Sequence, residues 1–222
     1  MGVLVDEKQV PKWKVIIPTI IVALLLPATP YALARGHSEY FIVHEHYNMD
    51  SEFLEFIVNK HMNTDNLTDA LQTAYALAVS RKYVPDPGDE DIIKRPSVTY
   101  YLGGDCEDKA VLLASLIKKW AELHNKDLKV GLMLMNLKYG DGREEGHAVV
   151  VVWEGTIVPR KMAVLDPTLY FSEKLTSPGK AISNYSKYLE KYYNAKITKS
   201  GVFSFPVFRA TFFPTLIAVI YR

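Results

Sequence analysis

The stretch of the sequence best suited to chemistry is GGDCEDKAVLLASLI, residues 103–117, which contains the only cysteine of the chain, Cys106. A glycine turn gives way here to a strongly apolar helical pattern, and Asp105 and Asp108 are spaced to cap the first turn of that helix. Cys106 would lie at the positive end of the helix dipole, which favours a thiolate, whereas a nearby acid such as Glu107 opposes ionisation. A nucleophilic cysteine in this position needs a cation beside it, and histidine is the usual one.

A histidine and an acid follow at positions where an antiparallel hairpin would bring them together. His147 opens the run GHAVVVVW after a glycine-containing loop, and Asp166 closes the next run, in VLDPT. Because the start of one antiparallel strand lies beside the end of the next, we expect His147 and Asp166 to be neighbours. A helix that brings Cys106 to this edge of the sheet would complete a nucleophile, a base and an orienting acid.

These three motifs resemble the transglutaminase-like superfamily of cysteine peptidases and acyltransferases. The resemblance rests on GDCEDKAVLLASLI, GHAVVVV and VLDPT and covers residues 65–170. It implies a papain-like core with Cys106 as the nucleophile, His147 as the base and Asp166 as the orienting acid. It also implies acyl transfer at the amide of a protein or peptide substrate, with no metal or organic cofactor.

The residues leave two questions of chemistry open. With water as the second acceptor the reaction is that of a peptidase or amidase, and with a lysine amine it is cross-linking. The backbone N–H of Cys106 is one candidate oxyanion donor, and Tyr100 or Tyr101 is a candidate for the second. The alternative function is a catalytically silent binding or structural domain of an envelope assembly, because a lone cysteine on an apolar helix is commonly an inert core residue.

Hydrophobic periodicity predicts the elements that position these residues. Asp50 or Ser51 would cap the first helix and Thr68 the second, and tyrosines on one side of the last helix are typical of a half-buried face. Helices are predicted over residues 49–63, 67–83, 106–124 and 182–196.

Strand patterns fill the middle of the chain. Period-two alternation predicts antiparallel strands over 128–139, 147–154 and 156–166, with a hairpin turn at Asp141-Gly142. The segment 84–98 holds three prolines and an acidic cluster, which predicts a loop. The fold class is therefore α+β, with helices packed on an antiparallel sheet.

Composition limits the partners and the possible sites. With 26 basic and 25 acidic residues the net charge is +1, and no long basic run follows a phosphate backbone, so nucleic acid is not expected as a partner. The acidic run from Asp86 to Asp91 lacks the spacing of a calcium-binding EF-hand loop and is interpreted as a solvated loop. No metal site is predicted.

The N-terminus indicates export. Residues 15–34, VIIPTIIVALLLPATPYALA, are uncharged, follow Lys12 and Lys14, and end in an A-x-A pattern at Ala34. We predict that residues 1–34 are a signal peptide or a membrane anchor and that residues 35–222 form the transglutaminase-like cysteine protease domain. The protein would then lie outside the cytoplasm, secreted or held at the membrane by its N-terminal segment.

The C-terminus, VFSFPVFRATFFPTLIAVIYR, is predicted to form one or two terminal strands or a tail that contacts a membrane. Its prolines and Arg209 argue against a spanning helix, so we favour strand.

Overall fold

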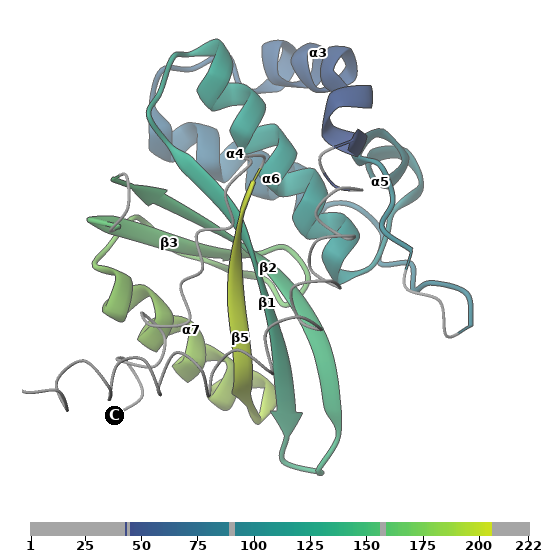
Figure 1. Cartoon of the computed structure of the whole chain (residues 1–222), viewed down its shortest axis with the longest axis vertical. Coiled ribbons are helices and arrows are strands. Elements are labelled where there is room, and N and C mark those ends of the chain that lie inside the picture. Colours follow the sequence, from purple (N-terminus) through teal and green to yellow (C-terminus); the bar gives the residue numbers. More distant parts are fainter. Residues whose placement is uncertain (1–42, 44, 89–91, 156–158, 206–222) are drawn as a thin grey trace, which may run out of the picture. The chain divides into compact units, whose positions relative to one another are not determined.

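The structure is a computed structural model, and it describes residues 43, 45–88, 92–155 and 159–205. Helices and strands follow one another as an α+β fold (Figure 1). The elements are α3 (Ser51–His61), α4 (Leu67–Val79), α5 (Pro96–Leu102), α6 (Cys106–Leu123), β1 (Lys129–Tyr139), β2 (Glu144–Glu154), β3 (Lys161–Asp166), β4 (Phe171–Ser172), α7 (Pro178–Tyr193) and β5 (Ala195–Phe205).

The strands form one antiparallel sheet in the order β4-β3-β2-β1-β5. Neighbouring strands β1, β2 and β3 follow one another in the chain, as their periodicity predicts. β5 pairs with β1 and forms the other edge of the sheet, and Figure 1 shows it in yellow along that strand. The first residues of the predicted C-terminal strand, 202–205, belong to β5, and residues 206–222 lie outside the described part of the chain.

The two faces of the sheet carry separate hydrophobic clusters. On one face, β2 and β3 residues such as Val150 and Leu165 pack with buried residues of α3, α4 and α6. On the other face, Val149 and Val164 pack with Tyr185 and other buried residues of α7. Because side chains alternate along a strand, His147 shares the α7 face with Val149.

One of the two predicted helix caps is wrong, and the other is correct in position alone. Asn66 caps α4 in place of Thr68, because its side-chain oxygen accepts from the backbone N–H groups of Thr68 and Asp69. Asp50 takes the N-cap position of α3, as predicted, but its side chain makes no hydrogen bond to the first turn of that helix. Its carboxylate accepts at 2.6 Å from the backbone N–H of Ser97, in the first turn of α5.

Three element boundaries also differ from the sequence predictions. The end of the predicted loop 84–98 is the start of α5, where Pro96 takes the first helical position. The predicted strand 156–166 begins at Lys161 as β3, and residues 156–158 lie outside the described ranges. Helix α7 ends at Tyr193, before the predicted end at residue 196, because Asn194 has a left-handed φ of 50° and leads directly into β5.

The predicted signal or anchor, residues 1–34, lies outside the residues that the structure describes. Within the described ranges, no helix combines the length and the apolar character needed to cross a membrane. The assignment of residues 1–34 stays a prediction.

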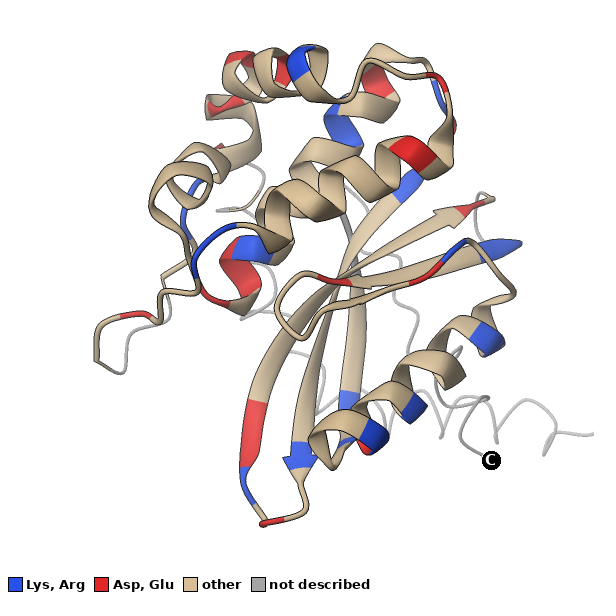
Figure 2. Ribbon diagram, turned by 180° about the vertical axis from the view of Figure 1, so that it is seen from behind, with Lys and Arg blue, Asp and Glu red and all other residues tan. Residues whose placement is uncertain are grey.

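Basic and acidic residues are both spread over the helices and strands (Figure 2). Figure 2 shows acidic residues at the start of α6 and basic residues along α7. The acidic residues at the start of α6 flank Cys106 in the chain. That nucleic acid is not a partner stays a prediction.

Candidate active site

His147 and Asp166 form a buried pair between β2 and β3. The Nε2 atom of His147 lies 2.8 Å from Oδ2 of Asp166, and the two residues are 8% and 0% exposed. An ionised carboxylate only accepts hydrogen bonds, so Nε2 carries the proton in this pair. The other ring nitrogen, Nδ1, is then the one suited to receive a proton from a thiol.

The Asp166 carboxylate is held from several directions. Its Oδ1 accepts from the backbone N–H groups of Thr168 and Leu169, both at 2.9 Å, and its Oδ2 also accepts from the Tyr185 hydroxyl at 2.7 Å. Burial by itself would raise the pKa of Asp166, but the hydrogen bond and charge of His147, with these further donors, hold that pKa below its usual value. Asp166 is therefore ionised at neutral pH.

The turn before Cys106 requires glycine at two positions. Gly103 has φ 83°, and a Cβ there would collide with the Lys82 carbonyl oxygen. A Cβ on Gly104 would collide with the Asp108 side chain. The chain therefore enters α6 in a tight turn that places Cys106 at the first helical position, as the sequence predicts.

The predicted capping box of α6 is confirmed. Asp105 accepts from the backbone N–H of Asp108 at 3.4 Å, and the Asp108 carboxylate accepts from the backbone N–H of Asp105 at 3.3 Å. Lys94 reinforces this helix start, because its Nζ lies 2.5 Å from Asp108 and 2.6 Å from Asp86. Lys94 thus links the preceding loop to the first turn of the helix that carries Cys106.

The Cys106 thiol donates to a neighbouring acid in this structure. Its Sγ lies 3.0 Å from Oε2 of Glu107. Burial raises the pKa of the thiol above its usual value and the Glu107 carboxylate raises it further, whereas the backbone N–H of Ala148 lowers it. Ala148 follows His147 directly on β2, so the cysteine and the histidine belong to the same region of the fold. No hydrogen bond joins Cys106 to His147 within the described ranges.

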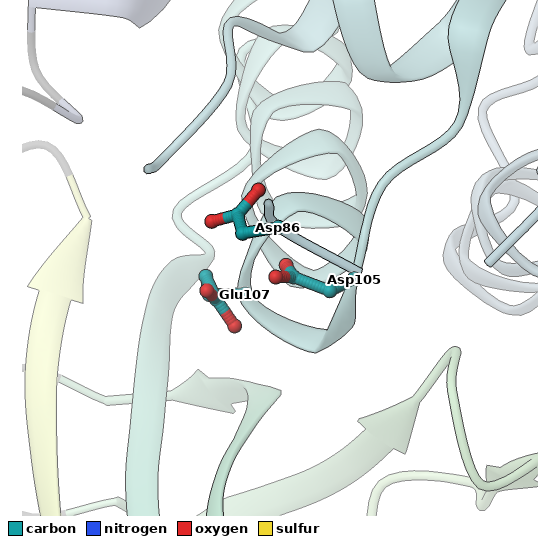
Figure 3. Close-up of side chains that lie close together, drawn as sticks. All are labelled: Asp86, Asp105 and Glu107. Atoms are coloured by element: carbon teal, nitrogen blue, oxygen red, sulfur yellow. The ribbon is translucent and has the colours of Figure 1, made fainter. Parts of the chain in front are cut away.

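Three carboxylates gather on the side of α6 that carries Cys106. Asp86, Asp105 and Glu107 each offer an oxygen, and these atoms lie within 4.8 Å of one another (Figure 3). Burial and the nearby Asp108 raise the pKa of Asp105 to about 6. Carboxylate oxygens are the ligands of hard cations such as Ca²⁺, but acidic clusters are also common without an ion. No ion is assigned to this cluster.

The two tyrosines considered as oxyanion donors lie on α5. The rings of Tyr100 and Tyr101 pack against Phe53 of α3, and Tyr101 is 70% exposed. No hydrogen bond links either hydroxyl to Cys106 in the described part of the chain. Tyr83 lies nearer to the site, because it pairs with Gly104 in a parallel bridge two residues before Cys106. Burial raises the pKa of Tyr83, and the charge of Cys106 contributes.

Sequence analysis did not single out Tyr75, Lys94 or Tyr185 as part of the site. The Tyr75 hydroxyl reaches the backbone oxygen of Asp166 at 3.3 Å from α4, and Tyr185 reaches its carboxylate from α7. The tyrosine-rich face of the last predicted helix was the available signal for Tyr185. Its spacing along the chain does not indicate which carboxylate it meets.

Comparisons with known proteins give a distant likeness. No family model and no curated protein matches the sequence. Three solved structures of LapG from Legionella pneumophila are similar in fold. The calcium-bound form is 16% identical over 62% of this chain and 68% of its own, with a TM-score of 0.40. A second structure is 13% identical over 68% and 82%, and the EGTA-treated form 14% over 68% and 83%, each with a TM-score of 0.41.

Proposed function

We propose that this protein is a cysteine peptidase or amidase of the transglutaminase-like class, acting on protein or peptide amides at the cell envelope. The observation that carries the proposal is the buried His147–Asp166 pair between β2 and β3, next to Ala148, whose backbone N–H lowers the pKa of the Cys106 thiol. A thiol at a helix start, a base and an orienting acid are the parts that covalent acyl transfer needs.

In the proposed reaction, Nδ1 of His147 takes the proton from the Cys106 sulfur, and the thiolate attacks the carbonyl carbon of the amide. The oxygen becomes an oxyanion, which the backbone N–H of Cys106 is placed to stabilise at the start of α6. The C–N bond then breaks as the imidazolium returns the proton to the leaving amine. A thioester on Cys106 remains.

Water or a second amine completes the cycle. His147 removes a proton from the acceptor, which attacks the thioester carbon, and the thiol leaves with that proton. Asp166 holds Nε2–H throughout and stabilises the imidazolium that forms twice in each cycle. With water the product is a carboxylic acid, and with a lysine amine it is a new amide.

The reaction requires the Cys106 side chain to turn from Glu107 towards His147. One observation favours the second candidate function, a catalytically silent domain of an envelope assembly: the thiol donates a hydrogen bond to Glu107, whose charge opposes ionisation of the thiol. The two candidates therefore differ in what the thiol does when an amide is supplied.

Incubation of the full chain with a library of unfolded peptides, followed by mass spectrometry of new N-termini, tests the proposal. We expect new termini with the parent protein and none with Cys106→Ala. The same library contains Gln and Lys peptides and an added primary amine. Hydrolysis gives a carboxylic acid and transfer gives an amide, and the mass of the product distinguishes the two reactions. If the parent and Cys106→Ala give the same peptide spectrum, the silent domain is the correct function.

A further inference from the structure

The tyrosine-rich face of α7 contacts the loop that follows Asp166. Tyr188 and Tyr193 donate to the backbone oxygen of Leu169, at 2.7 and 3.0 Å. Tyr185 differs from both, because its hydroxyl donates to the Asp166 carboxylate itself. Among the described residues, Tyr185 is the only tyrosine of α7 that donates a hydrogen bond to that carboxylate.

Tyr185 and His147 share one oxygen of the carboxylate. Oδ2 of Asp166 receives the Tyr185 hydroxyl at 2.7 Å and Nε2 of His147 at 2.8 Å, while Oδ1 receives two backbone N–H groups. The carboxylate therefore has four donors for its two oxygens, which leaves it little freedom to rotate. Tyr185 is 0% exposed, so water does not compete at its hydroxyl.

We propose that Tyr185 is a positioning residue that holds Oδ2 of Asp166 on the imidazole of His147. The inference rests on the proposed function, in which His147 acts as the base. It assigns to the tyrosine face of α7 a role in the site, although α7 supplies no nucleophile or base.

The loss of the Tyr185 hydroxyl has a definite direction. A donor stabilises the ionised form of a carboxyl group, and burial disfavours it. Without the hydroxyl, Oδ2 keeps one donor, His147, at a buried site where the Tyr185 ring packs with Val149 and Val164. The pKa of Asp166 therefore rises in Tyr185→Phe.

Other charged or titratable groups face Asp166 without donating to Oδ2 in the described ranges. Lys109 of α6 is buried and interacts with the charge of Asp166, and Tyr75 of α4 binds only its backbone oxygen. The pKa of Tyr193 also responds to Asp166, after burial and Tyr188. These groups remain in place in Tyr185→Phe, so they do not replace the lost donor.

The experiment is a pH titration of the Asp166 side-chain carbon by NMR in the full chain, compared between Tyr185→Phe and its matched control, Tyr188→Phe. Both variants remove one hydroxyl from the same face of α7. We expect the midpoint to move to higher pH in Tyr185→Phe and to stay at the parent value in Tyr188→Phe. Equal midpoints in the two variants, or a lower one in Tyr185→Phe, would overturn the proposal.

Kinetics supply a second readout that a purely structural role does not move. For an amide that the parent cleaves, kcat should fall about tenfold in Tyr185→Phe, the rate equivalent of one hydrogen bond to a charged group, with KM unchanged. A change in KM alone, or an equal loss in Tyr188→Phe, contradicts a positioning role.

The NMR titration does not require turnover, so the two proposals fail separately. An unchanged Asp166 midpoint alongside Cys106-dependent cleavage refutes the role of Tyr185 alone. A raised midpoint in a chain that cleaves nothing refutes the peptidase and leaves Tyr185 as a structural partner of Asp166.

Discussion

At the scale of single residues, the site combines one group that is stabilised in its charged form with one that is not. Asp166 has four donors and a lowered pKa despite complete burial. Cys106 faces Glu107 and has a raised pKa. The chemistry of the site therefore depends on whether His147 takes the thiol proton or the thiol stays protonated beside Glu107.

Glu107→Gln tests the opposing charge. Removal of a negative charge 3.0 Å from the sulfur favours the thiolate, so the pKa of the Cys106 thiol falls. We expect alkylation by iodoacetamide at pH 8 to become roughly tenfold faster, since each pKa unit changes the thiolate fraction about tenfold. Asp127→Asn, which removes an exposed acid beside Lys129, is the control and should react like the parent. An unchanged rate in Glu107→Gln would show that its carboxylate does not govern the thiol.

Asp166→Asn tests the buried pair through the pH dependence of stability. Because the pKa of Asp166 is lowered in the folded state, its contribution is fully present above the unfolded value of about 3.9 and is lost as the pH falls through the folded pKa. In urea unfolding, the variant should be less stable than the parent at pH 7, and the gap should narrow below about pH 4. If the difference in stability between the variant and the parent is the same at pH 7 as below about pH 4, Asp166 is not an ionised, hydrogen-bonded group.

At the scale of elements, the start of α6 is fixed by contacts on both sides of it. Gly103 and Gly104 allow the tight entry, and the capping box closes the first turn. The Asp108 carboxylate also binds the backbone N–H and the Nζ of Lys94. One buried acid thus joins the loop, the turn and the helix that position Cys106.

Asp108→Ala should therefore destabilise the fold well beyond the loss of a helix cap. It leaves Lys94 and the Asp105 backbone N–H without their buried acceptor, so we expect a loss of about 2–4 kcal/mol in the free energy of unfolding. Asp141→Ala, which removes an exposed acid paired with Arg143 in the β1–β2 turn, should leave the urea midpoint unchanged. Similar midpoints for the two variants would exclude the role given to Asp108.

The elements that sequence analysis predicted correctly are those with local signals. The capping box of α6 follows from the spacing of Asp105 and Asp108, and the contact of His147 with Asp166 follows from the pairing of consecutive strands. The pairing of β5 with β1 joins segments distant in the chain, and no local pattern predicts it. Pro96 was a usable signal for α5, because proline favours the first helical position.

The partners of side chains were the least predictable part. Glu107 was recognised as a charge that opposes ionisation, but its hydrogen bond to Cys106 depends on a rotamer that sequence does not specify. The contact of Tyr185 with Asp166 depends on how α7 crosses the sheet. Tertiary packing sets both of these contacts.

At the scale of the whole molecule, the site draws on both faces of the sheet. Cys106 comes from α6, which packs with α3 and α4 on one face, and Tyr185 comes from α7 on the other. His147 and Asp166 connect the two through β2 and β3. His147 and Tyr185, which are far apart in the sequence, therefore both donate to the Asp166 carboxylate.

The proposed location at the envelope makes a prediction for the whole chain. Residues 15–34 are uncharged and end at an A-x-A pattern, so the mature protein should fractionate outside the cytoplasm. Mass spectrometry of the purified protein should find either a new N-terminus at Arg35 or an intact chain in the membrane fraction. A full-length product in the soluble cytosolic fraction would contradict export and anchoring alike.

The central claim is that His147 takes the proton of Cys106. The pH dependence of iodoacetamide alkylation tests it most directly, because Cys106 is the only cysteine and the label reports on it alone. Burial and Glu107 raise the pKa of the thiol, so fast reaction at neutral pH requires a base beside the sulfur. Proton transfer to His147 predicts rapid labelling of the parent at pH 7 and a rate at least about tenfold lower in His147→Ala. Equal rates in the two proteins, rising only at alkaline pH, would contradict it.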